Sequence, residues 1–468
     1  MATPVPLTAG VIAAASGGRL RSGDPGRVID GFAIDSRRLA AGDLFFAIVA
    51  ARDGHDFVVD AVQRGAAGVV VARPVDVPGA GPEGPVVIEV PETTRALQDL
   101  ARHVRRASGA TVVAITGSAG KTTTKEAIAA LLEARYRVVK NAGNLNNHLG
   151  LPLSLLELRH GADVAVMELG MNHAGEIRVL TGIAEPEWRV WTNVGEAHLG
   201  FFGTAEGIAD AKAEILEGAR PSDCLVANAD DARVMARAPR FAGEVRTFGA
   251  AEGATVRQVA VEARGIDGSH VSVATPAGPL ELDVPLLGRG NVANVLAAVT
   301  VALGMDVPLD TMAGRIARMA PAPHRGAVRR LGKGVTLVDD SYNSSPSALE
   351  RALEVIGAET RCARRAAVLG EMLELGEASA ELHRRSGRAA AAAGLARLVT
   401  VGGEPARALG DAATEAGMPP TTVTHVDTSA DAADVMASWL APGDLVLVKG
   451  SRGTRTDVVV NRIEAEFA

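Results

Sequence analysis

A glycine-rich loop that contains one lysine is the segment of this chain best suited to chemistry. It stands between a β-branched run and a stretch of helical periodicity and reads Thr116-Gly117-Ser118-Ala119-Gly120-Lys121-Thr122-Thr123. In such a loop the backbone N–H groups converge on phosphate oxygens, and the start of the following helix adds positive potential. Lys121 can reach the β- and γ-phosphates, and the Thr122 hydroxyl can bind Mg²⁺. The loop therefore predicts a site for ATP and Mg²⁺.

The loop is a short form of the phosphate-binding pattern. The strict pattern has a further glycine where this chain has Ile115, so the spacing that remains is G-x-x-G-K-T. The alternative interpretation is a glycine-rich turn with an unrelated lysine. It does not explain why a strand, a helix and Thr122 accompany the lysine.

Two polar residues follow predicted strands. Glu168 ends the strand that begins at Asp163, and His198 follows the strand Val190–Val194 within Thr-Asn-Val-Gly-Glu-Ala-His. Ligands of open parallel sheets lie beyond the carboxyl ends of the strands. A carboxylate suits Mg²⁺, whereas imidazole is an unusual direct ligand and can act through a water. Each residue alone is more typical of a satisfied structural group, but their position after a phosphate loop favours a metal site.

Further candidates lie on predicted helices and after a later strand. Lys212 stands in a helical stretch, where a solvated helix face is the usual interpretation. Asn291 and Asn294 open a helix after Gly-Arg-Gly, and Asn291 can equally be a helix cap. Arg325 can reach a transferred phosphoryl group, as arginines do in other phosphoryl transfers. Asp340 ends a strand and is followed by Ser-Tyr342-Asn343.

Strands and helices alternate from Thr111 onward, which favours parallel sheets covered on both faces. In the middle of the chain we expect strands at 111–115, 163–169, 189–194 and 224–228, a helix at 121–135 and an edge hairpin formed by 271–275 and 280–284. A second series indicates a doubly wound sheet, with strands at 335–339, 366–369, 398–401 and 445–448 and helices at 346–356, 379–393, 405–415 and 430–440.

The first hundred residues are poor in strand pattern and rich in turns, and they end in a helix over Thr93–Ser108. The predicted fold class is α/β with three domains. We expect a small N-terminal α/β substrate domain at 1–108, a central phosphate-loop ATPase domain with a parallel sheet at 109–321, and a C-terminal Rossmann-like domain at 322–468.

Composition limits the classes of partner. The net charge is −7 with no basic block, which disfavours nucleic acid and anionic membranes. No apolar run reaches the ~20 residues that span a bilayer, and the N-terminus lacks a basic signal-peptide region. Cys224 and Cys362 lie in apolar runs, so we expect two buried, reduced thiols. These features predict a soluble cytoplasmic protein without membrane insertion.

In this order, the motifs resemble those of the Mur ligases, the amide-forming enzymes of peptidoglycan assembly. The resemblance covers nearly the whole chain and is carried by Gly-Lys-Thr-Thr, Glu168, Asn-Val-Gly-x-Ala-His198, Ala-Lys212-x-Glu-Ile, Asn291-x-x-Asn294, His-Arg325 and Asp340. Within the family, the strings that start at Asn144, Asp339, Leu369 and Lys449 are similar to those of the member that adds a terminal dipeptide.

The resemblance implies an ATP-dependent ligase that joins D-alanyl-D-alanine to UDP-N-acetylmuramoyl-tripeptide through an acyl phosphate. It implies catalytic roles for Lys121, His198, Lys212 and Arg325, and metal ligation by Thr122, Glu168, His198 and, if carbamylated, Lys212. Nucleotide contacts are implied for the phosphate loop, Asn291, Asn294, Arg325 and Asp340. Substrate contacts are implied for Ser36, Arg37, Asp53, Gly54, His55, Asn146, Asn147, Tyr342 and Asn343. We expect a monomer.

Two alternatives remain open at this point. One keeps the fold and changes the acceptor, as in a tripeptide-forming or folylpolyglutamate-type ligase. The other is a phosphate-loop protein that binds nucleotide and signals by conformation without turnover.

The lysine of the loop gives the first test. Replacing Lys121 with alanine removes a charge that stabilises the transferred phosphoryl group, so turnover should fall by about 10²–10³. Steady-state ADP release measures this effect. Near-normal turnover in the variant would refute the role of Lys121.

Overall fold

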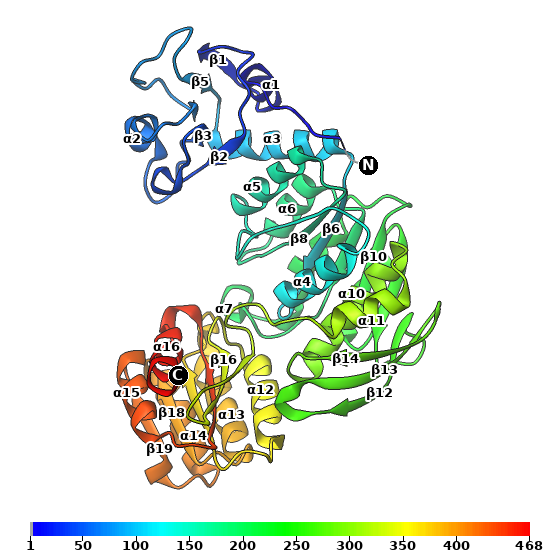
Figure 1. Ribbon diagram of the computed structural model, residues 1–468, viewed down its shortest axis with the longest axis vertical. Helices are drawn as coiled ribbons and strands as arrows, with labels where there is room; N and C mark the ends of the chain where they lie inside the picture. The colour runs from blue at the N-terminus through cyan, green and yellow to red at the C-terminus, as the bar shows by residue number, and fades with distance from the viewer. Residues whose placement is uncertain (1–2) are drawn as a thin grey trace. The chain divides into compact units, whose positions relative to one another are not determined.

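The protein, described by a computed structural model over residues 3–468, is an α/β chain with three β-sheets (Figure 1). It divides into two compact units. One comprises the residues up to 114 together with 135–189 and 217–223, and the other comprises 115–134, 190–216 and 224–468. The α/β class expected from the sequence is confirmed. The three domains expected at 1–108, 109–321 and 322–468 stay a prediction.

The first sheet has five short strands in the order β1-β5-β4-β3-β2. Only β1 runs antiparallel to its neighbour. The bounds are β1 Arg19–Ser22, β2 Gly31–Ala33, β3 Asp43–Phe46, β4 Gly68–Val71 and β5 Val86–Glu89, with helices α1 Ala9–Ala15 and α2 Val58–Gln63 in the same region. The weak strand pattern of this region therefore hides a complete sheet, in keeping with the α/β domain expected there. Strands of three or four residues, such as the fully buried β4, are too short to show an alternating pattern.

The long helix α3 spans Thr93–Ser108, as the sequence predicts. The Glu92 side chain accepts the N–H groups of Thr94 and Arg95, both at 2.6 Å, and Gly109 ends the helix in the left-handed region at φ 65°. Its apolar residues recur at helical spacing and are buried, and the helix packs against α5 (Gly150–Leu156) and α6 (Glu176–Ala184).

The second sheet has nine strands in the order β14-β13-β12-β11-β10-β9-β6-β8-β7. Its strands are β6 Thr111–Thr116, β7 Val138–Lys140, β8 Val164–Glu168, β9 Trp188–Trp191, β10 Cys224–Asn228, β11 Glu244–Gly249, β12 Val256–Ala263, β13 Ser269–Thr275 and β14 Gly278–Val284. Strands β10, β11 and β12 are parallel neighbours, whereas β12, β13 and β14 are antiparallel. The edge hairpin predicted around Pro276 is therefore confirmed.

The other helices of this region are α4 Lys121–Leu132, α7 Leu199–Phe202, α8 Ala205–Ala213, α9 Ala232–Arg237, α10 Gly288–Gly304 and α11 Leu309–Ile316. Strand β6 is β-branched and buried over most of its length, and α4 begins directly after Gly120. This strand–turn–helix is the context that a phosphate loop requires.

The third sheet has six strands in the order β15-β16-β20-β17-β18-β19, of which only β15 is antiparallel to its neighbour. The strands are β15 Ala327–Arg330, β16 Thr336–Asp340, β17 Arg365–Gly370, β18 Arg397–Val401, β19 Val423–Val426 and β20 Leu445–Lys449. The helices are α12 Pro346–Ala358, α13 Ser379–Ala392, α14 Glu404–Glu415, α15 Ser429–Trp439 and α16 Asp457–Phe467. The sequence did not predict β15, β19 or α16.

Helices cover both faces of this third sheet, which confirms the doubly wound arrangement (Figure 1). Alternate strand residues such as Leu369 and Leu447 pack with α12, α13 and α14. Their neighbours Val368 and Val446 pack with α15 and α16. Because both faces are buried, the strands appear in the sequence as continuous apolar runs.

The structure also bears on the expectations for the two cysteines and for membrane-spanning helices. Both cysteines are free thiols; Cys224 is buried, and burial raises its pKa to about 12. Cys362 lies in the turn after α12 and is only partly buried. The expectation of a buried thiol is therefore confirmed for Cys224 and wrong for Cys362. Among residues 3–468, no helix is both long enough and apolar enough to cross a membrane.

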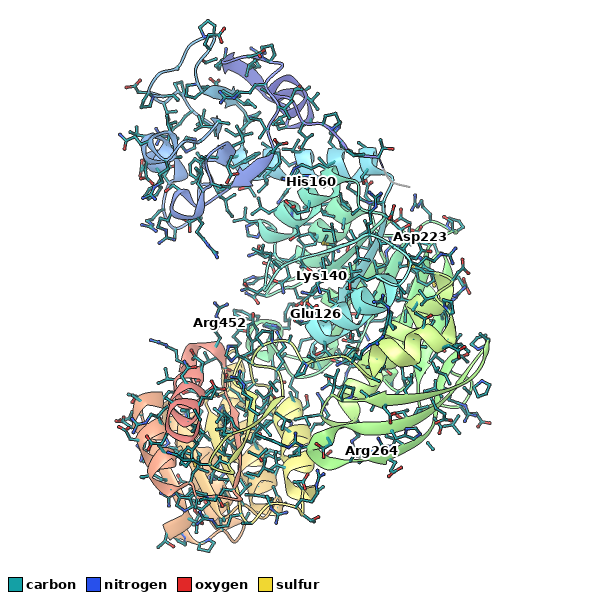
Figure 2. All side chains as sticks on the ribbon, in the orientation of Figure 1. Glu126, Lys140, His160, Asp223, Arg264 and Arg452 are labelled. Atoms are coloured by element: carbon teal, nitrogen blue, oxygen red, sulfur yellow. The ribbon has the colours of Figure 1, made fainter. Side chains whose placement is uncertain are left out.

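A buried ion pair supports the start of β10. Arg189 Nη1 donates to Asp223 Oδ2 at 3.0 Å, and these side chains are only 2% and 1% exposed; Asp223 is labelled in Figure 2. Replacing Asp223 with alanine removes the carboxylate that pairs with this buried guanidinium and should lower the free energy of unfolding by about 3–5 kcal/mol. Urea denaturation measures this difference.

The matched control for that variant is Arg178→Ala. Arg178 pairs with Glu217, and both side chains are about half exposed, at 58% and 47%. Solvent screens such a pair, so the expected loss is below about 1 kcal/mol. Equal losses in the two variants would contradict the role given to the buried pair.

Candidate active site

Most of the predicted nucleotide residues line one large cavity of ≈1180 Å³ in the second compact unit, but Thr116, Gly117, Lys121 and Thr122 are not among its lining residues. Its wall includes nine of the residues that the sequence singles out: Ser118, Ala119, Gly120, Thr123, Asn291, Asn294, Arg325, Asp340 and Asn343. They come from the phosphate loop and the first turn of α4, from the start of α10, from the segment before β15, and from the end of β16 with the residues after it. Tertiary structure therefore brings to one cavity residues that are more than two hundred positions apart in the chain.

Two glycines of the phosphate loop stand where no side chain fits. A Cβ atom on Gly120 would lie 2.2 Å from Asn294 Oδ1, and Gly120 has a left-handed φ of 84°. A Cβ atom on Gly117, whose φ is 153°, would lie 1.9 Å from Thr192 Oγ1. Only glycine satisfies both limits, so the loop backbone can approach a bound phosphate closely. The loop backbone can therefore bind the phosphates of a nucleoside triphosphate.

Two residues that directly follow β9, Thr192 and Asn193, hold the phosphate loop in place through hydrogen bonds. Asn193 Oδ1 accepts the Ala119 N–H and Asn193 Nδ2 donates to the Ala119 carbonyl, both at 2.9 Å. The Thr192 hydroxyl donates to the same carbonyl at 2.8 Å, and Ser118 N–H donates to the Asn193 carbonyl at 3.0 Å. These two residues fix the loop before any ligand binds. Sequence analysis assigned them no role, although they stand in the motif that contains His198.

Three groups that can carry charge lie close together behind the loop. Lys121 Nζ donates to the Gly117 carbonyl at 2.9 Å. Burial, followed by the charge of Lys121, holds the pKa of the His198 imidazole below its usual value. The same two causes lower the pKa of the Lys212 amine well below its usual value, because Lys212 is buried within α8. Both shifts favour the neutral forms of His198 and Lys212 beside the charged Lys121.

The His198 imidazole contacts a carboxylate that sequence analysis did not select. His198 Nδ1 lies 2.5 Å from Glu374 Oε2. Glu374 belongs to the segment between β17 and α13, which the sequence marked only as a family motif.

Glu168, the strand-end carboxylate of the other compact unit, is buried at 3% exposure. Asn146 Nδ2 donates to Glu168 Oε1 at 2.8 Å, and Asn141 bonds the backbone of Glu168 in both directions at 3.1 Å. Asn146, expected at the substrate, thus touches the predicted metal ligand. Asn147 accepts the Gly150 N–H at 2.8 Å and supports the start of α5.

The predicted Mg²⁺ ligands are of the chemical kind that a phosphate-loop site uses. Within residues 3–468, no group of three or more His, Cys, Asp or Glu side chains is arranged to hold a metal by itself. At a phosphate loop, Mg²⁺ takes most ligands from phosphate oxygens and water and only one or two from the protein. The Thr122 hydroxyl and the Glu168 carboxylate are oxygen ligands of the required kind.

An ion pair between a buried lysine and a partly exposed aspartate joins the ends of two neighbouring strands of the third sheet. Asp340 ends β16 and Lys449 ends β20, and the two residues are partners in the parallel register. Lys449 Nζ donates to Asp340 Oδ2 at 2.6 Å and to the Asn343 carbonyl at 3.0 Å. Lys449 fixes the direction of Asp340 at the cavity wall, and sequence analysis gave it no role.

Arginines flank the ring of Tyr342. The guanidinium carbon of Arg325 lies 4.2 Å from the ring centre, and that of Arg452 lies 6.0 Å from it. Arg452 is labelled in Figure 2. The aromatic face orients the guanidinium of Arg325, which leaves its N–H groups available for an anion.

The substrate residues predicted near the N-terminus form two local clusters. Asp53 accepts the backbone N–H of His55 at 2.9 Å and Arg73 Nη2 at 3.0 Å, and its Oδ1 lies 2.6 Å from His55 Nδ1. These partners lower the pKa of Asp53, the backbone N–H of His55 most of all. His55 is buried and its Nε2 accepts the Ala72 N–H at 2.9 Å, while Gly54 packs against the backbone of Ile48.

The second cluster surrounds the short turn that begins at Ser36. Arg37 is exposed and bonds Asp35 through Nε at 2.9 Å and Nη2 at 2.8 Å. These bonds lower the pKa of Asp35 to about 2. Ser36 is buried, and its hydroxyl is the main cause that holds the pKa of Asp60 below its usual value. Of the two residues predicted here, Arg37 is the one exposed to a ligand.

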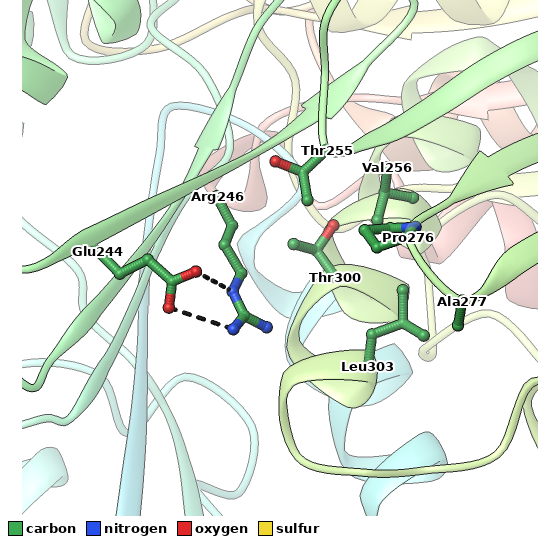
Figure 3. A pocket seen from close by; sticks show the side chains of 8 residues that line it. All are labelled: Glu244, Arg246, Thr255, Val256, Pro276, Ala277, Thr300 and Leu303. Atoms are coloured by element: carbon green, nitrogen blue, oxygen red, sulfur yellow. Dashed lines mark hydrogen bonds and ion pairs between the residues drawn. The ribbon is translucent and has the colours of Figure 1, made fainter.

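A second, smaller cavity of ≈390 Å³ contains none of the predicted site residues (Figure 3). Its wall pairs Arg246 with Glu244, through Nε at 2.8 Å and Nη2 at 3.1 Å, and the Thr300 hydroxyl donates to the Leu296 carbonyl at 2.8 Å. Because these polar groups bond one another, they do not converge on a ligand. The candidate active site is therefore the larger cavity.

The hydrogen bonds between Asn193 and Ala119 of the phosphate loop allow a second functional test. Replacing Asn193 with alanine removes two hydrogen bonds to Ala119, worth about 1–3 kcal/mol together. The dissociation constant for ADP or ATP should rise by about 5- to 150-fold. Isothermal titration calorimetry measures it, with the exposed Asn172→Ala as the control. An unchanged affinity would show that the loop holds its shape without Asn193.

Comparison with known proteins places these features in one family. Three family models match the chain: "Mur ligase family, catalytic domain" at residues 28–105, "Mur ligase middle domain" at 115–302 and "Mur ligase, glutamate ligase domain" at 324–452. The phosphate loop, the His198 motif and α10 up to residue 302 fall within the middle model.

Similarity to individual proteins extends over most of the length. A UDP-N-acetylmuramoyl-tripeptide--D-alanyl-D-alanine ligase of Bacillus subtilis is 32% identical over 437 residues, which covers 92% of this chain and 93% of the relative. A crystal structure of MurF from Acinetobacter baumannii has a TM-score of 0.87 at 30% identity over 99% of both chains. MurF from Thermotoga maritima in complex with ADP has a TM-score of 0.81 at 30% identity, over 93% of this chain and 97% of that one. Because sequence and fold agree over nearly all its length, the chain belongs to the Mur ligase family.

Proposed function

We propose that this protein is an ATP-dependent ligase that joins D-alanyl-D-alanine to UDP-N-acetylmuramoyl-tripeptide and so makes the pentapeptide precursor of peptidoglycan. The observation that carries the proposal is the cavity where the phosphate loop, α10 and the segment after β16 meet. The name of the Bacillus subtilis relative supplies the two substrates, and the ADP complex of the Thermotoga maritima protein supports ATP as the third.

The chemistry follows from the poor reactivity of a carboxylate toward amines. One oxygen of the terminal carboxylate of the tripeptide attacks the γ-phosphorus of ATP, the bond from that phosphorus to the β-bridging oxygen breaks, and ADP leaves. The amine of the dipeptide then attacks the carbonyl carbon of the acyl phosphate. The tetrahedral intermediate loses phosphate and the nitrogen loses a proton, which leaves an amide. Each step needs two anions or polar groups held in line.

Residues of the second compact unit can supply the charge that this alignment needs. Lys121 would neutralise the β- and γ-phosphates, and Arg325 would stabilise charge on the transferred group. Asn291 and Asn294 would bind the nucleotide from the start of α10. Asp340, held by Lys449 at 2.6 Å, would accept hydrogen bonds from the ribose or base.

Mg²⁺ is the proposed metal. Thr122, Glu168 and His198, together with Lys212 if its amine is carbamylated, would hold it. When bound, it would neutralise phosphate charge and polarise the γ-phosphoryl group. The lowered pKa of Lys212 supports carbamylation, since only a neutral amine adds carbon dioxide.

The remaining assignments concern the substrates and the organisation of the chain. We assign the UDP-sugar to an N-terminal domain at 1–108 through Ser36, Arg37 and the Asp53–His55 turn. ATP is assigned to a central domain at 109–321, and the dipeptide to a C-terminal domain at 322–468 through Tyr342 and Asn343. Asn146 and Asn147 would contact the tripeptide. We further propose a cytoplasmic monomer.

One experiment tests the reaction and the acceptor together. ADP release is measured with ATP, Mg²⁺ and UDP-N-acetylmuramoyl-tripeptide, with and without D-alanyl-D-alanine. We expect release to depend on the dipeptide, and the product to gain the mass of the dipeptide less one water. The matched negative control is L-alanyl-L-alanine.

Other outcomes separate the alternatives. Release that ignores the dipeptide but responds to a single amino acid would assign the sister reaction, and response to a folate with glutamate would assign the folylpolyglutamate type. ATP binding without stimulation by any amine would indicate a nucleotide sensor.

A further inference from the structure

One arginine in the wall of the large cavity stands apart from the ion pairs around it. Arg351 lies on the second turn of α12, which packs against α10; both helices are labelled in Figure 1. Its guanidinium is partly buried and makes no hydrogen bond or ion pair with any group of residues 3–468. Burial lowers the pKa of Arg351, but a guanidinium keeps its charge in proteins. The cavity wall therefore contains a permanent positive charge that no carboxylate contacts.

The carboxylates nearest to Arg351 in the helix are bound by other arginines. Glu354 accepts a hydrogen bond from Arg289 Nη2 at 2.8 Å, and Glu350 accepts one from Arg385 Nε at 2.6 Å. Burial is the main cause that opposes the charge of Arg351, and the two carboxylates favour it only from a distance. A charged group that is taken from water without a contacting partner is unfavourable. A ligand with hydrogen-bond acceptors at this point of the cavity would relieve that penalty.

The place of Arg351 follows from the face of α12 that lines the cavity. Ser347, Arg351 and Val355 recur every four residues, and all three line it. A Cβ atom on Gly195 would lie 3.5 Å from Ser347 Oγ and 3.6 Å from the Cβ of Ser118. Ser347 therefore stands beside the phosphate loop, and Arg351 lies one helical turn further, about 6 Å along the axis.

Helix α10 gives a similar separation independently. A Cβ atom on Gly120 of the phosphate loop would lie 2.2 Å from Asn294 Oδ1, whereas one on Gly290 would lie 3.3 Å from Arg351 Nε. Gly290 precedes Asn294 by four residues, which is again about 6 Å along the helix axis. Asn291, an expected nucleotide contact, lies between them in the chain. Both helices therefore place Arg351 about one helical turn beyond the phosphate loop.

We infer that Arg351 is a further nucleotide-binding residue, whose guanidinium contacts the ribose and base of ATP and not its phosphates. The inference rests on the proposed function, which puts ATP in this cavity. With the phosphates in the loop, the ribose and base extend along the cavity past the loop, where Arg351 lies. Ribose oxygens and purine ring nitrogens accept hydrogen bonds, and a guanidinium can also stack on the face of the base. Either contact supplies the partner that the protein itself does not.

Binding of nucleotide with and without its nucleoside part tests this inference. Isothermal titration calorimetry in the presence of Mg²⁺ gives the dissociation constants of ADP and of inorganic tripolyphosphate. Arg351→Met keeps an apolar side chain of similar length but removes the charge and the donors. We expect ADP to bind this variant about 5- to 30-fold more weakly than the wild-type protein. Tripolyphosphate should bind both proteins equally well.

Two further variants separate a direct contact from long-range attraction. Arg388→Met is the matched control, because it removes one positive charge from a half-exposed residue of α13 outside the cavity wall; both affinities should stay at their wild-type values. Arg351→Lys keeps the charge but not the planar set of donors, so it should recover only part of the ADP affinity. Circular dichroism verifies that each variant is folded.

The outcomes separate this inference from the proposed reaction. An unchanged ADP affinity in Arg351→Met would overturn the inference. An equal loss for ADP and tripolyphosphate, or full recovery in Arg351→Lys, would also overturn it, because each would indicate that charge alone acts on the phosphates. A wild-type protein that binds no ADP would overturn both proposals. One that binds ADP but fails the ligase assay would count against the proposed reaction alone, since nucleotide binding needs neither tripeptide nor dipeptide.

Discussion

The phosphate loop can work only if uncharged backbone N–H groups stand close enough to a polyanion to bind it, and much of the site serves that constraint. Close approach excludes side chains at Gly117 and Gly120, whose hypothetical Cβ atoms would collide with Thr192 and Asn294. One of these neighbours also defines the loop, since Thr192 and the adjacent Asn193, which directly follow β9, bond Ala119. The residues after β9 and the start of α10 therefore determine the shape of the loop.

The basic groups around the loop differ in how readily they carry a positive charge. Lys121 is close to the loop, whereas burial favours the neutral forms of His198 and Lys212. Three full positive charges so close together would repel one another, and in a buried site little water screens them. The arrangement keeps one strong cation at the phosphates and leaves two weakly basic groups that can bind or stabilise a metal ion.

The third sheet contributes to this site through its strand ends. Asp340 and Lys449 are the last residues of parallel strands and Glu374 lies in the segment after β17, at the edge where ligands of doubly wound sheets lie. Two ion pairs connect this part of the fold to the segment after β9: Glu374 contacts His198, and Arg385 of α13 pairs with Glu196. A nucleotide bound in the cavity would thus touch residues that follow strands of both the second and the third sheet.

The sequence by itself determined the local chemistry and most of the elements. Spacing and residue type identified the phosphate loop, the strand-end residues and the α/β class, because each depends on neighbours only a few positions away. It could not identify Asn193, Lys449 or Glu374 as parts of the site, since each takes its role from a partner on another strand or loop. It predicted an α/β domain at the N-terminus but no strand bounds there, because the strands of the first sheet are too short for a periodic pattern. Tertiary structure decided which candidates meet, because bond distances and burial depend on contacts between residues far apart in the chain.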